Sequence, residues 1–214
     1  MSKSKLIKTP VWDAAFTHLK NPNTKFVPEG VYSIDLRAPE DEMTAWIKAE
    51  IEPILMNFKA ADPKLSKASI ILPAPREVFH KNEDTGEYDI PTNLVALQFK
   101  VAASGVDKAG EAWTRGPIAL FDSKGKQITS KDVFVGFDDK VRVTFSPNPY
   151  YSPLTKSISF SFNRLRGVQI VTKNATSSTM AGMFDSVEGG YTVDDAGDAD
   201  SGKPAPFLDD DIPY

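Results

Sequence analysis

The sequence contains no cysteine among its 214 residues. This absence excludes a disulfide framework, a thiolate metal site and a cysteine nucleophile, and it is compatible with a reducing compartment. Histidine is nearly absent too, since His18 and His80 are the two in the chain. Their separation in sequence gives none of the short spacings typical of a metal site, and we expect no metal and no cofactor.

Long apolar runs are also missing. No stretch approaches the roughly 20 apolar residues that a membrane span requires. The basic segment Met1–Lys8 lacks the apolar centre of a signal peptide. From these two absences we expect a cytoplasmic protein that does not contact a membrane.

Motifs for catalysis are a further absence. The sequence has no glycine-rich phosphate loop followed by Lys-Ser or Lys-Thr, and neither histidine lies in a triad or a zinc motif. The carboxylate pair Asp138-Asp139 is more typical of a hairpin turn than of a magnesium site. We therefore expect no catalytic residues.

Charge is present but unevenly divided. Residues 183–214 hold nine acids and one lysine, a net charge of −8, and the other 182 residues hold 24 bases and 20 acids, a net charge of +4. A mildly basic body with a strongly acidic tail is typical of a nucleic-acid binder that carries a competing polyanion. Because folding signals vanish after about residue 174, residues 174–214 are predicted to be a largely disordered tail.

The first 29 residues are punctuated by prolines and mix lysines with Trp12 and Phe16. This mixture suits single-stranded nucleic acid, whose phosphates attract cations and whose bases stack on flat rings. Residues 1–29 are therefore predicted to form an N-terminal arm. A short helix over residues 11–19 that packs Trp12, Phe16 and Leu19 onto a core is the open alternative.

The next segments predict a strand and a helix. Apolar and polar residues alternate over 29–36, which indicates a strand. Apolar residues recur at helical spacing over 41–59, which indicates an amphipathic helix with Trp46 in the core. Pro53 lies off the apolar stripe and should kink or divide this helix.

Strand patterns dominate the rest of the body, after an irregular stretch over 60–93 with a local hairpin at its Asp-Thr-Gly turn. Helical segments do not alternate with strands, so we predict a mainly β fold over residues 30–173. The expected architecture is an OB-fold-like small barrel of five to six strands with one amphipathic helix. A bulge is expected at Gly167. The predicted strands are 93–104, 116–122, 132–137, 140–146 and 156–172, with a basic turn at 122–126 and a proline-broken loop at 147–153.

The end of the sequence has a pattern that a folded domain rarely needs. Three carboxylates precede an aliphatic residue, a proline and an aromatic residue, which suits a peptide that inserts its ring into a pocket with a basic rim. The pattern resembles the C-terminal tip of bacterial single-stranded DNA-binding proteins, which carry Phe where this chain has Tyr214. The predicted protein-interaction residues are Asp209, Asp210, Asp211, Ile212, Pro213 and Tyr214.

Several blocks, in the same order, resemble the tailed-phage single-stranded DNA-binding proteins. They are residues 30–36, the amphipathic helix, residues 121–126, residues 140–145 leading into Pro149-Tyr150, the last strand and the acidic tail. The resemblance implies an OB-type core that binds single-stranded DNA without reading its sequence during phage DNA replication, recombination or repair. It also implies contacts with a polymerase or helicase through the tail, location in the host cell cytoplasm, and an aromatic DNA contact at Tyr150. A homodimer is a further expected assembly.

Sequence-tolerant binding of single strands requires aromatic platforms for the bases and cations for the phosphates. For Trp113 and the arginines, stacking or phosphate contact competes with a purely structural or solvated role, and Phe134 and Phe137 are expected in the core. The candidate DNA-binding residues are Trp113, Arg115, Lys124, Lys126, Lys131, Arg142, Tyr150, Tyr151, Lys156, Arg164 and Arg166.

Two other functions remain open at this point. A single-stranded RNA-binding OB module would present the same platforms and cations. A phage structural or adaptor protein would use the barrel for protein contacts instead, and it would show no salt-dependent binding of oligonucleotides.

Overall fold

The computed structural model describes residues 6–130 and 132–174. The helical segments are α1 (Glu40–Trp46), the π-helical turn η1 (Ile47–Ile51), α2 (Glu52–Ala61) and the 3-10 turn η2 (Pro63–Leu65). The strands are β1 (Ile7–Lys8), β2 (Trp12–Asn23), β3 (Val31–Pro39), β4 (Ser69–Ile70), β5 (Arg76–Lys81), β6 (Tyr88–Ala102), β7 (Ser104–Val106), β8 (Ala112–Thr114), β9 (Ala119–Phe121), β10 (Gln127–Ile128), β11 (Lys140–Phe145), β12 (Pro149–Ser152), β13 (Ser157–Phe160) and β14 (Leu165–Thr172).

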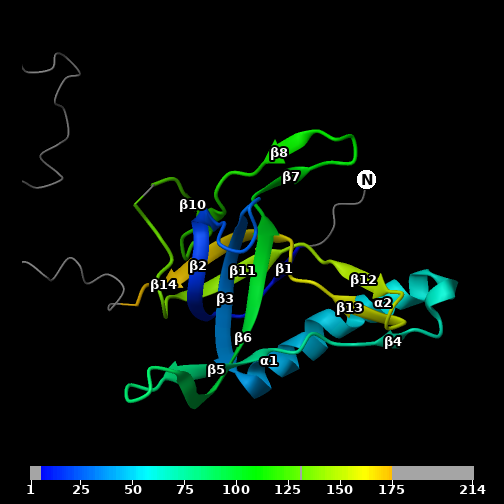
Figure 1. The fold of residues 1–214 in the computed structure, drawn as a ribbon, viewed down its shortest axis with the longest axis horizontal. Helices are drawn as coiled ribbons and strands as arrows, with labels where there is room; N and C mark the ends of the chain where they lie inside the picture. Colours follow the sequence, from blue (N-terminus) through cyan, green and yellow to red (C-terminus); the bar gives the residue numbers. More distant parts are fainter. Residues whose placement is uncertain (1–5, 131, 175–214) are drawn as a thin grey trace, which may run out of the picture. The chain divides into compact units, whose positions relative to one another are not determined.

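Five long strands form the wall of a barrel. β14, β11, β2, β3 and β6 are neighbours in one sheet, which curves around the core (Figure 1). The curve closes where the backbone N–H of Lys100 on β6 donates to the carbonyl of Phe162, 2.9 Å away in the segment before β14. The mainly β, OB-fold-like barrel predicted from the sequence is therefore confirmed. Within the described residues, β10, β9, β5 and β1 extend this sheet to nine strands, more than the five or six expected.

Alternation along the strands decides which side chains enter the barrel. On β11, Val141, Val143 and Phe145 are buried and their neighbours point outward, as the sequence predicted. The predicted bulge at Gly167 is confirmed, because the β11–β14 register shifts beside it. A Cβ atom at Gly167 would lie 2.9 Å from the ring of Phe121, so the close approach of β9 requires glycine there.

The predicted helix is confirmed, and it begins and ends within two residues of the expected bounds. Its buried face includes Met43, Trp46, Ile51 and Leu55. Pro53 does not separate the helix into two. The five-residue π-helical turn η1 leads directly into α2, and Pro53 lies in the first turn of α2. Proline has no N–H to donate, and the wider turn before it accommodates that missing bond.

An aromatic cluster joins the helix to the barrel. The ring centroid of Phe145 lies 5.1 Å from that of Phe99 on β6, 5.6 Å from that of Phe162 and 6.2 Å from that of Trp46 on α1. Trp46 also meets Trp12 of β2 at 5.2 Å. These contacts place α1 against the barrel interior and bring five separate chain segments together.

The prediction of an N-terminal arm or a helix over residues 11–19 is wrong. β2 runs from Trp12 to Asn23 and lies in the middle of the sheet, between β11 and β3. The β2–β3 register shifts between Ala15 and His18, so a bulge interrupts the alternation. Because the bulge interrupts the two-residue alternation of the strand, Trp12, Phe16 and Leu19 follow a sequence spacing that is also typical of a helix.

Four further predictions need correction. Residues 132–137 form no regular strand, and Phe134 and Phe137 are about half exposed rather than in the core. The strand expected over 156–172 is divided into β13 and β14, because the residues between them turn to pair with β6 at Lys100. Part of the expected loop over 147–153 forms β12, which pairs with β13.

The aromatic cluster makes a stability prediction. Truncating the fully buried ring of Phe145 by Phe145→Ala should lower the free energy of unfolding by about 3–5 kcal/mol, because it removes contacts to three other segments and leaves a cavity. Urea unfolding followed by circular dichroism measures this difference. The matched control is Leu154→Ala, whose side chain is 94% exposed and whose loss should change stability by less than about 0.5 kcal/mol. A similar small loss for both variants would contradict the central role of the cluster.

Candidate nucleic-acid interface

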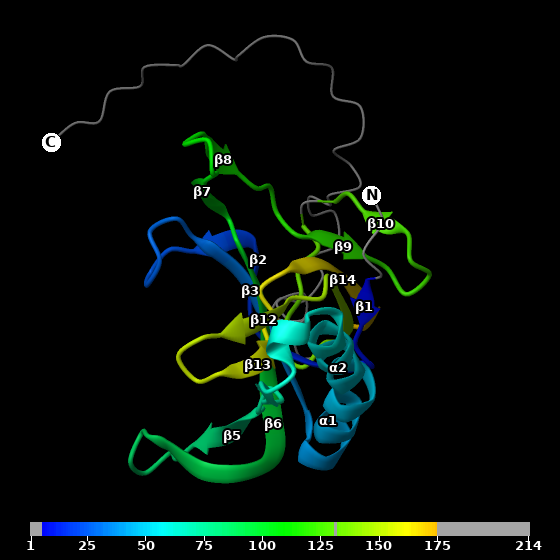
Figure 2. The same cartoon turned by 90° about the vertical axis from the view of Figure 1, so that its right-hand side faces the viewer.

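A groove of about 630 Å³ lies on the outer face of the barrel, over β2, β3 and β6. The β5–β6 hairpin forms one side of it. In Figure 2, this hairpin, the β2–β3 turn and the β12–β13 hairpin project to the left, and the β7–β8 hairpin rises at the top of the molecule. Aromatic and cationic residues that line the groove are Phe16, Phe79, Tyr88, Phe137, Arg37, Arg76 and Lys81, together with His18 and His80.

The floor of the groove holds a buried carboxylate in a hydrogen-bond network. Asp35 on β3 accepts from the side-chain amide of Gln98, its cross-strand partner on β6, at 3.1 Å. Arg76 on β5 reaches Asp35 past Ala96, whose small side chain leaves room for the guanidinium. The Arg76 side chain remains more than half exposed, so the network presents a cation on the groove floor.

Burial raises the pKa of the Asp35 carboxyl above its ordinary value of 3.8. The guanidinium of Arg76, the amide of Gln98 and the imidazole of His18 act in the opposite direction and offset part of this rise. The ion pair with Arg76 therefore offsets part of the cost of burying this carboxylate beside the groove.

One wall of the groove is a pair of exposed phenylalanine rings. Phe16, on the β2 bulge, and Phe137, before β11, lie edge to face with their centroids 6.3 Å apart. The guanidinium of Arg37 lies 4.1 Å from the centroid of the Phe137 ring and is paired with Asp138. The wall is therefore aromatic on its surface and has a cation behind it.

The segment that carries Phe137 is fixed by the buried carboxylate of Asp139. Asp139 accepts from the backbone N–H groups of Gly136 and Asn174, both at 2.8 Å, and from the ammonium of Lys173 at 2.9 Å. Because several donors converge on a fully buried carboxylate, residues 136–139 are held firmly although they form no regular strand.

The opposite side of the groove comes from the β5–β6 hairpin. Phe79, His80, Lys81 and Tyr88 line it, and Tyr88 is 66% exposed. The hydroxyl of Thr92 donates to the carbonyl of Val78 at 2.5 Å and accepts from the backbone N–H of Leu94, which stiffens the base of the hairpin. The groove thus has aromatic residues on both sides and paired polar groups between them.

The floor continues along β6 toward the β12–β13 hairpin. Lys100 is exposed and follows Gln98 at the alternating outward positions of β6, opposite Ser33 on β3. Its backbone bonds to the segment that follows β13. A bound polymer that extended from the groove over Lys100 would therefore reach the neighbourhood of β12.

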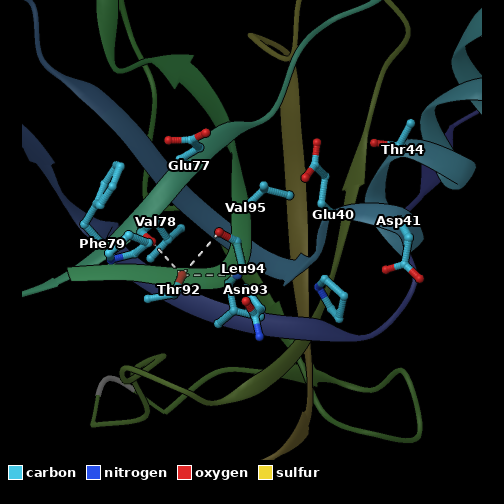
Figure 3. Close-up of a pocket in the computed structure, with 12 residues that line it drawn as sticks. Glu40, Asp41, Thr44, Glu77, Val78, Phe79, Thr92, Asn93, Leu94 and Val95 are labelled. Atoms are coloured by element: carbon cyan, nitrogen blue, oxygen red, sulfur yellow. Dashed lines mark hydrogen bonds between the residues drawn. The ribbon is translucent and has the colours of Figure 1, made fainter. Parts of the chain in front are cut away.

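A second cavity, of about 800 Å³, lies on the other side of the β5–β6 hairpin, next to α1. Glu40, Asp41 and Glu77 line it, and no lysine or arginine does (Figure 3). A polyanion would be repelled there. The two cavities differ in charge, and the groove over β2, β3 and β6 is the one that suits nucleic acid.

Trp113 and Arg115, two of the predicted DNA-binding residues, lie together at the β7–β8 hairpin. The Arg115 guanidinium is 5.9 Å from the Trp113 ring, which packs over Gly105 and is 36% exposed. The carbonyl of Arg115 accepts from the hydroxyl of Tyr32, and Ser104 bonds to the loop before β3. The pair is therefore at the β2–β3 turn, beside the groove rather than in it.

Tyr150 and Tyr151 lie on β12, and Lys156 is exposed at the turn into β13. Neighbours in a strand point to opposite faces. Tyr151 pairs with the buried Ile158, whereas Tyr150 pairs with Ser159. The two tyrosines therefore face opposite sides of the hairpin and cannot form one stacking platform.

The remaining predicted cations gather on a different face, over β11 and β14. A cavity of about 400 Å³ there is lined by Lys8, Arg166 and the turn residue Gly125. The side-chain amide of Gln169 donates to the carbonyls of Asp122 and Ser123, which fixes this turn against β14. The predicted residues on or beside this face are Lys124, Lys126, Arg142, Arg164 and Arg166.

Some predicted residues lie outside the described part of the chain. These are Lys131 and the tail residues, including Asp209, Asp210, Asp211, Ile212, Pro213 and Tyr214. The prediction of a disordered tail over 174–214 also concerns residues that, from 175 onward, lie outside it.

Sequence reasoning missed the groove as a unit. The sequence indicates contact with nucleic acid for Phe16 but does not predict the bulge that exposes it, and Phe137 is expected in the core. Arg37 and Arg76 were not singled out. One available signal was the outward parity of β3 and β6, which places Asp35, Arg37 and Gln98 on one face of the predicted sheet.

Two general features complete the description. No helix in the described ranges is long and apolar enough to cross a membrane. Among residues 6–130 and 132–174, no group of three or more His, Asp or Glu side chains is arranged to hold a metal ion.

Comparisons with known proteins find structural neighbours. No protein-family model matches the chain, and no curated protein matches it in sequence. The chain is similar to gp2.5, a single-stranded DNA binding protein encoded by bacteriophage T7, with 23% identity, a TM-score of 0.47 and coverage of 87% of this chain and 100% of that chain.

Two structures of the single-stranded DNA-binding protein from bacteriophage Enc34 are also similar. The complex with single-stranded DNA has 14% identity, a TM-score of 0.47 and coverage of 79% of this chain and 87% of that chain. The second has 16% identity, a TM-score of 0.44 and coverage of 90% of each chain. These neighbours are phage single-stranded DNA-binding proteins, the family that the sequence resembles.

The raised pKa of Asp35 predicts a pH effect on stability. A carboxyl whose pKa is higher in the folded than in the unfolded state destabilises the fold at neutral pH, and this penalty disappears as the pH falls through the folded pKa toward 3.8. On acidification from about pH 7.5 to about pH 4, wild type should therefore gain unfolding free energy relative to Asp35→Asn. Urea unfolding of both proteins at both pH values measures this. A relative loss would show that the ion pair with Arg76 outweighs the burial of Asp35.

Proposed function

We propose that the chain binds single-stranded DNA without sequence specificity, in the groove over β2, β3 and β6. The observation that carries this proposal is the composition of the groove: exposed aromatic rings line both sides, and the guanidinium of Arg76 lies between them. Rings that stand free in a groove offer their faces to unpaired bases. In a duplex, the faces of the bases are already stacked on one another and are not accessible to such rings.

The polar groups of the floor support sequence-tolerant binding. Asp35 accepts from the side-chain amide of Gln98 and pairs with Arg76, so its carboxylate is engaged within the protein. A carboxylate engaged in this way does not read base edges, whereas stacking serves every base. The exposed Lys100 and the hairpin residues Tyr150 and Lys156 extend the path beyond the groove.

We include the acidic tail in the proposal. Residues 183–214 carry −8 and the rest of the chain carries +4, so the tail competes with DNA for the basic body when DNA is absent. Displacement of the tail by DNA frees its terminal residues, ending in Tyr214, to recruit proteins of replication, recombination or repair such as a polymerase or helicase. The proposed place of action is the host cell cytoplasm, and a homodimer belongs to the same proposal.

The first test is binding of fluorescently labelled oligo-dT, measured by anisotropy at several salt concentrations. Affinity should fall linearly on a log–log plot, with a slope of about −0.7 for each phosphate contact. Matched RNA oligonucleotides should bind more weakly, and equal or tighter RNA binding would favour the RNA-binding function instead. Absence of salt-dependent binding to either strand would sink the proposal and favour an adaptor role.

Tyr88→Ala tests the groove itself. The side chain is largely exposed, so its removal should leave the fold intact and cost about 1–3 kcal/mol of binding, a loss of roughly 5- to 150-fold in oligo-dT affinity. Met56→Ala is the matched control, because that side chain is exposed on α2 and does not line the groove. An unchanged affinity for Tyr88→Ala, with normal salt-dependent binding, would place the DNA on another face.

Removal of the tail tests the competition. A chain that ends at residue 182 should bind oligo-dT more tightly than the full chain at low salt, and its affinity should depend more steeply on salt. The reason is that salt weakens the tail's competition as well as the DNA contacts, so the two effects partly cancel in the full chain. Identical affinities and slopes for the two proteins would show that the tail does not compete with DNA.

A further inference from the structure

Phe16 has a backbone conformation that bulky residues rarely adopt. Its φ is +45°, in the left-handed region, where a side chain other than glycine is strained. The ring nevertheless is 65% exposed, so burial of the side chain does not account for the strain. An exposed ring on a strained residue calls for another explanation.

The strained residue changes the direction of the side chain. Trp12 and Ala14 are buried and alternate along β2, so residue 16 of a regular strand would also point into the barrel. The register shift between Ala15 and His18 interrupts this alternation, and Phe16 is exposed on the groove instead. The bulge thus places on the outer face a ring that regular pairing would bury.

A second strained residue lies next to the first. Asp138, with φ of +62°, follows Phe137, and its segment pairs with β2 through the bonds from Asp138 N–H to the Ala14 carbonyl and from Ala14 N–H to the Asp139 carbonyl, both 2.9 Å. Phe137 is 53% exposed and meets Phe16 edge to face. Two unusual backbone conformations therefore bring two exposed rings together at one end of the groove.

The cation behind Phe137 is incompletely satisfied. Arg37 is 6% exposed, and its Nε atom is buried without a hydrogen-bond acceptor among the described residues. A buried donor without a partner is costly. This cost falls at the same end of the groove as the two strained residues Phe16 and Asp138.

We propose that the Phe16 ring, with Phe137 set edge to face against it, forms a platform that captures one unpaired nucleobase and is the strongest single subsite of the groove. This inference rests on the proposed function and adds to it the position of the main stacking contact. The strain at Phe16 is retained because it presents the ring to a base, and the platform is aromatic, so any of the bases can occupy it.

The decisive variant is Phe16→Gly. Glycine adopts positive φ without strain, so the variant should keep or raise the melting temperature of the wild type. It should bind oligo-dT about 10- to 100-fold more weakly, with an unchanged salt slope because no phosphate contact is lost. Phe16→Tyr, which keeps a ring, should retain binding close to that of the wild type.

Phe26→Gly is the matched control. Phe26 is 81% exposed in the β2–β3 turn and does not line the groove, so its loss should change oligo-dT affinity less than about twofold. Photocross-linking of an oligonucleotide that contains 5-iodouracil, followed by peptide mapping, should mark the segments that contain Phe16 or Phe137.

The outcomes separate this inference from the proposed function. Failure of the wild type to bind oligo-dT refutes the proposed function itself. Normal binding by Phe16→Gly, or cross-links confined to other segments, overturns the platform while single-stranded DNA binding stands. A melting temperature several degrees below that of the wild type also overturns it, because the ring would then serve the fold rather than the ligand.

Discussion

The structure depends on the packing around Phe145. This ring meets aromatic side chains from α1, from β6 and from the segment between β13 and β14, and it is itself carried by β11. Such a contact offsets part of the conformational entropy that is lost when elements distant in sequence are brought together. The barrel closes at the same place, where Lys100 bonds to the carbonyl of Phe162. The outer face of the barrel then holds its shape because the inner face is filled.

The outer face of the barrel buries some charged side chains and leaves other groups exposed to the groove. Asp35 and Arg37 point outward from β3, yet both are buried. Arg76 of β5 packs on Asp35, and the segment before β11, with Phe137 and Asp138, packs on Arg37. Buried charges require partners, and Arg76 supplies one for Asp35 as Asp138 does for Arg37. The same partners leave a guanidinium and aromatic rings open to the groove. The groove therefore owes its electrostatic character to groups that also satisfy the fold.

The predictions that succeeded rested on uninterrupted periodicity. The alternation of Val141, Val143 and Phe145 predicted β11, and the helical spacing of Met43, Ile51 and Leu55 predicted the helix. Those that failed involved irregular backbone. The bulge at Phe16 gave β2 the spacing of a helix, and the division between β13 and β14 lies at a tertiary hydrogen bond that has no sequence signal. Of the candidate site residues, Trp113 and Arg115 are brought together, but the cations of β11 and β14 lie on another face than the groove.

The sequence by itself determined the mainly β class, the single amphipathic helix and the division of charge between body and tail, because these follow from composition and from patterns within short segments. Only the tertiary structure decided which exposed rings share a surface. Phe16, Tyr88 and Phe137 lie far apart in sequence, and they meet at one groove because the barrel curves and because two residues with positive φ redirect the chain. Side-chain direction at a bulge depends on pairing with neighbouring strands, and the local sequence does not encode that pairing.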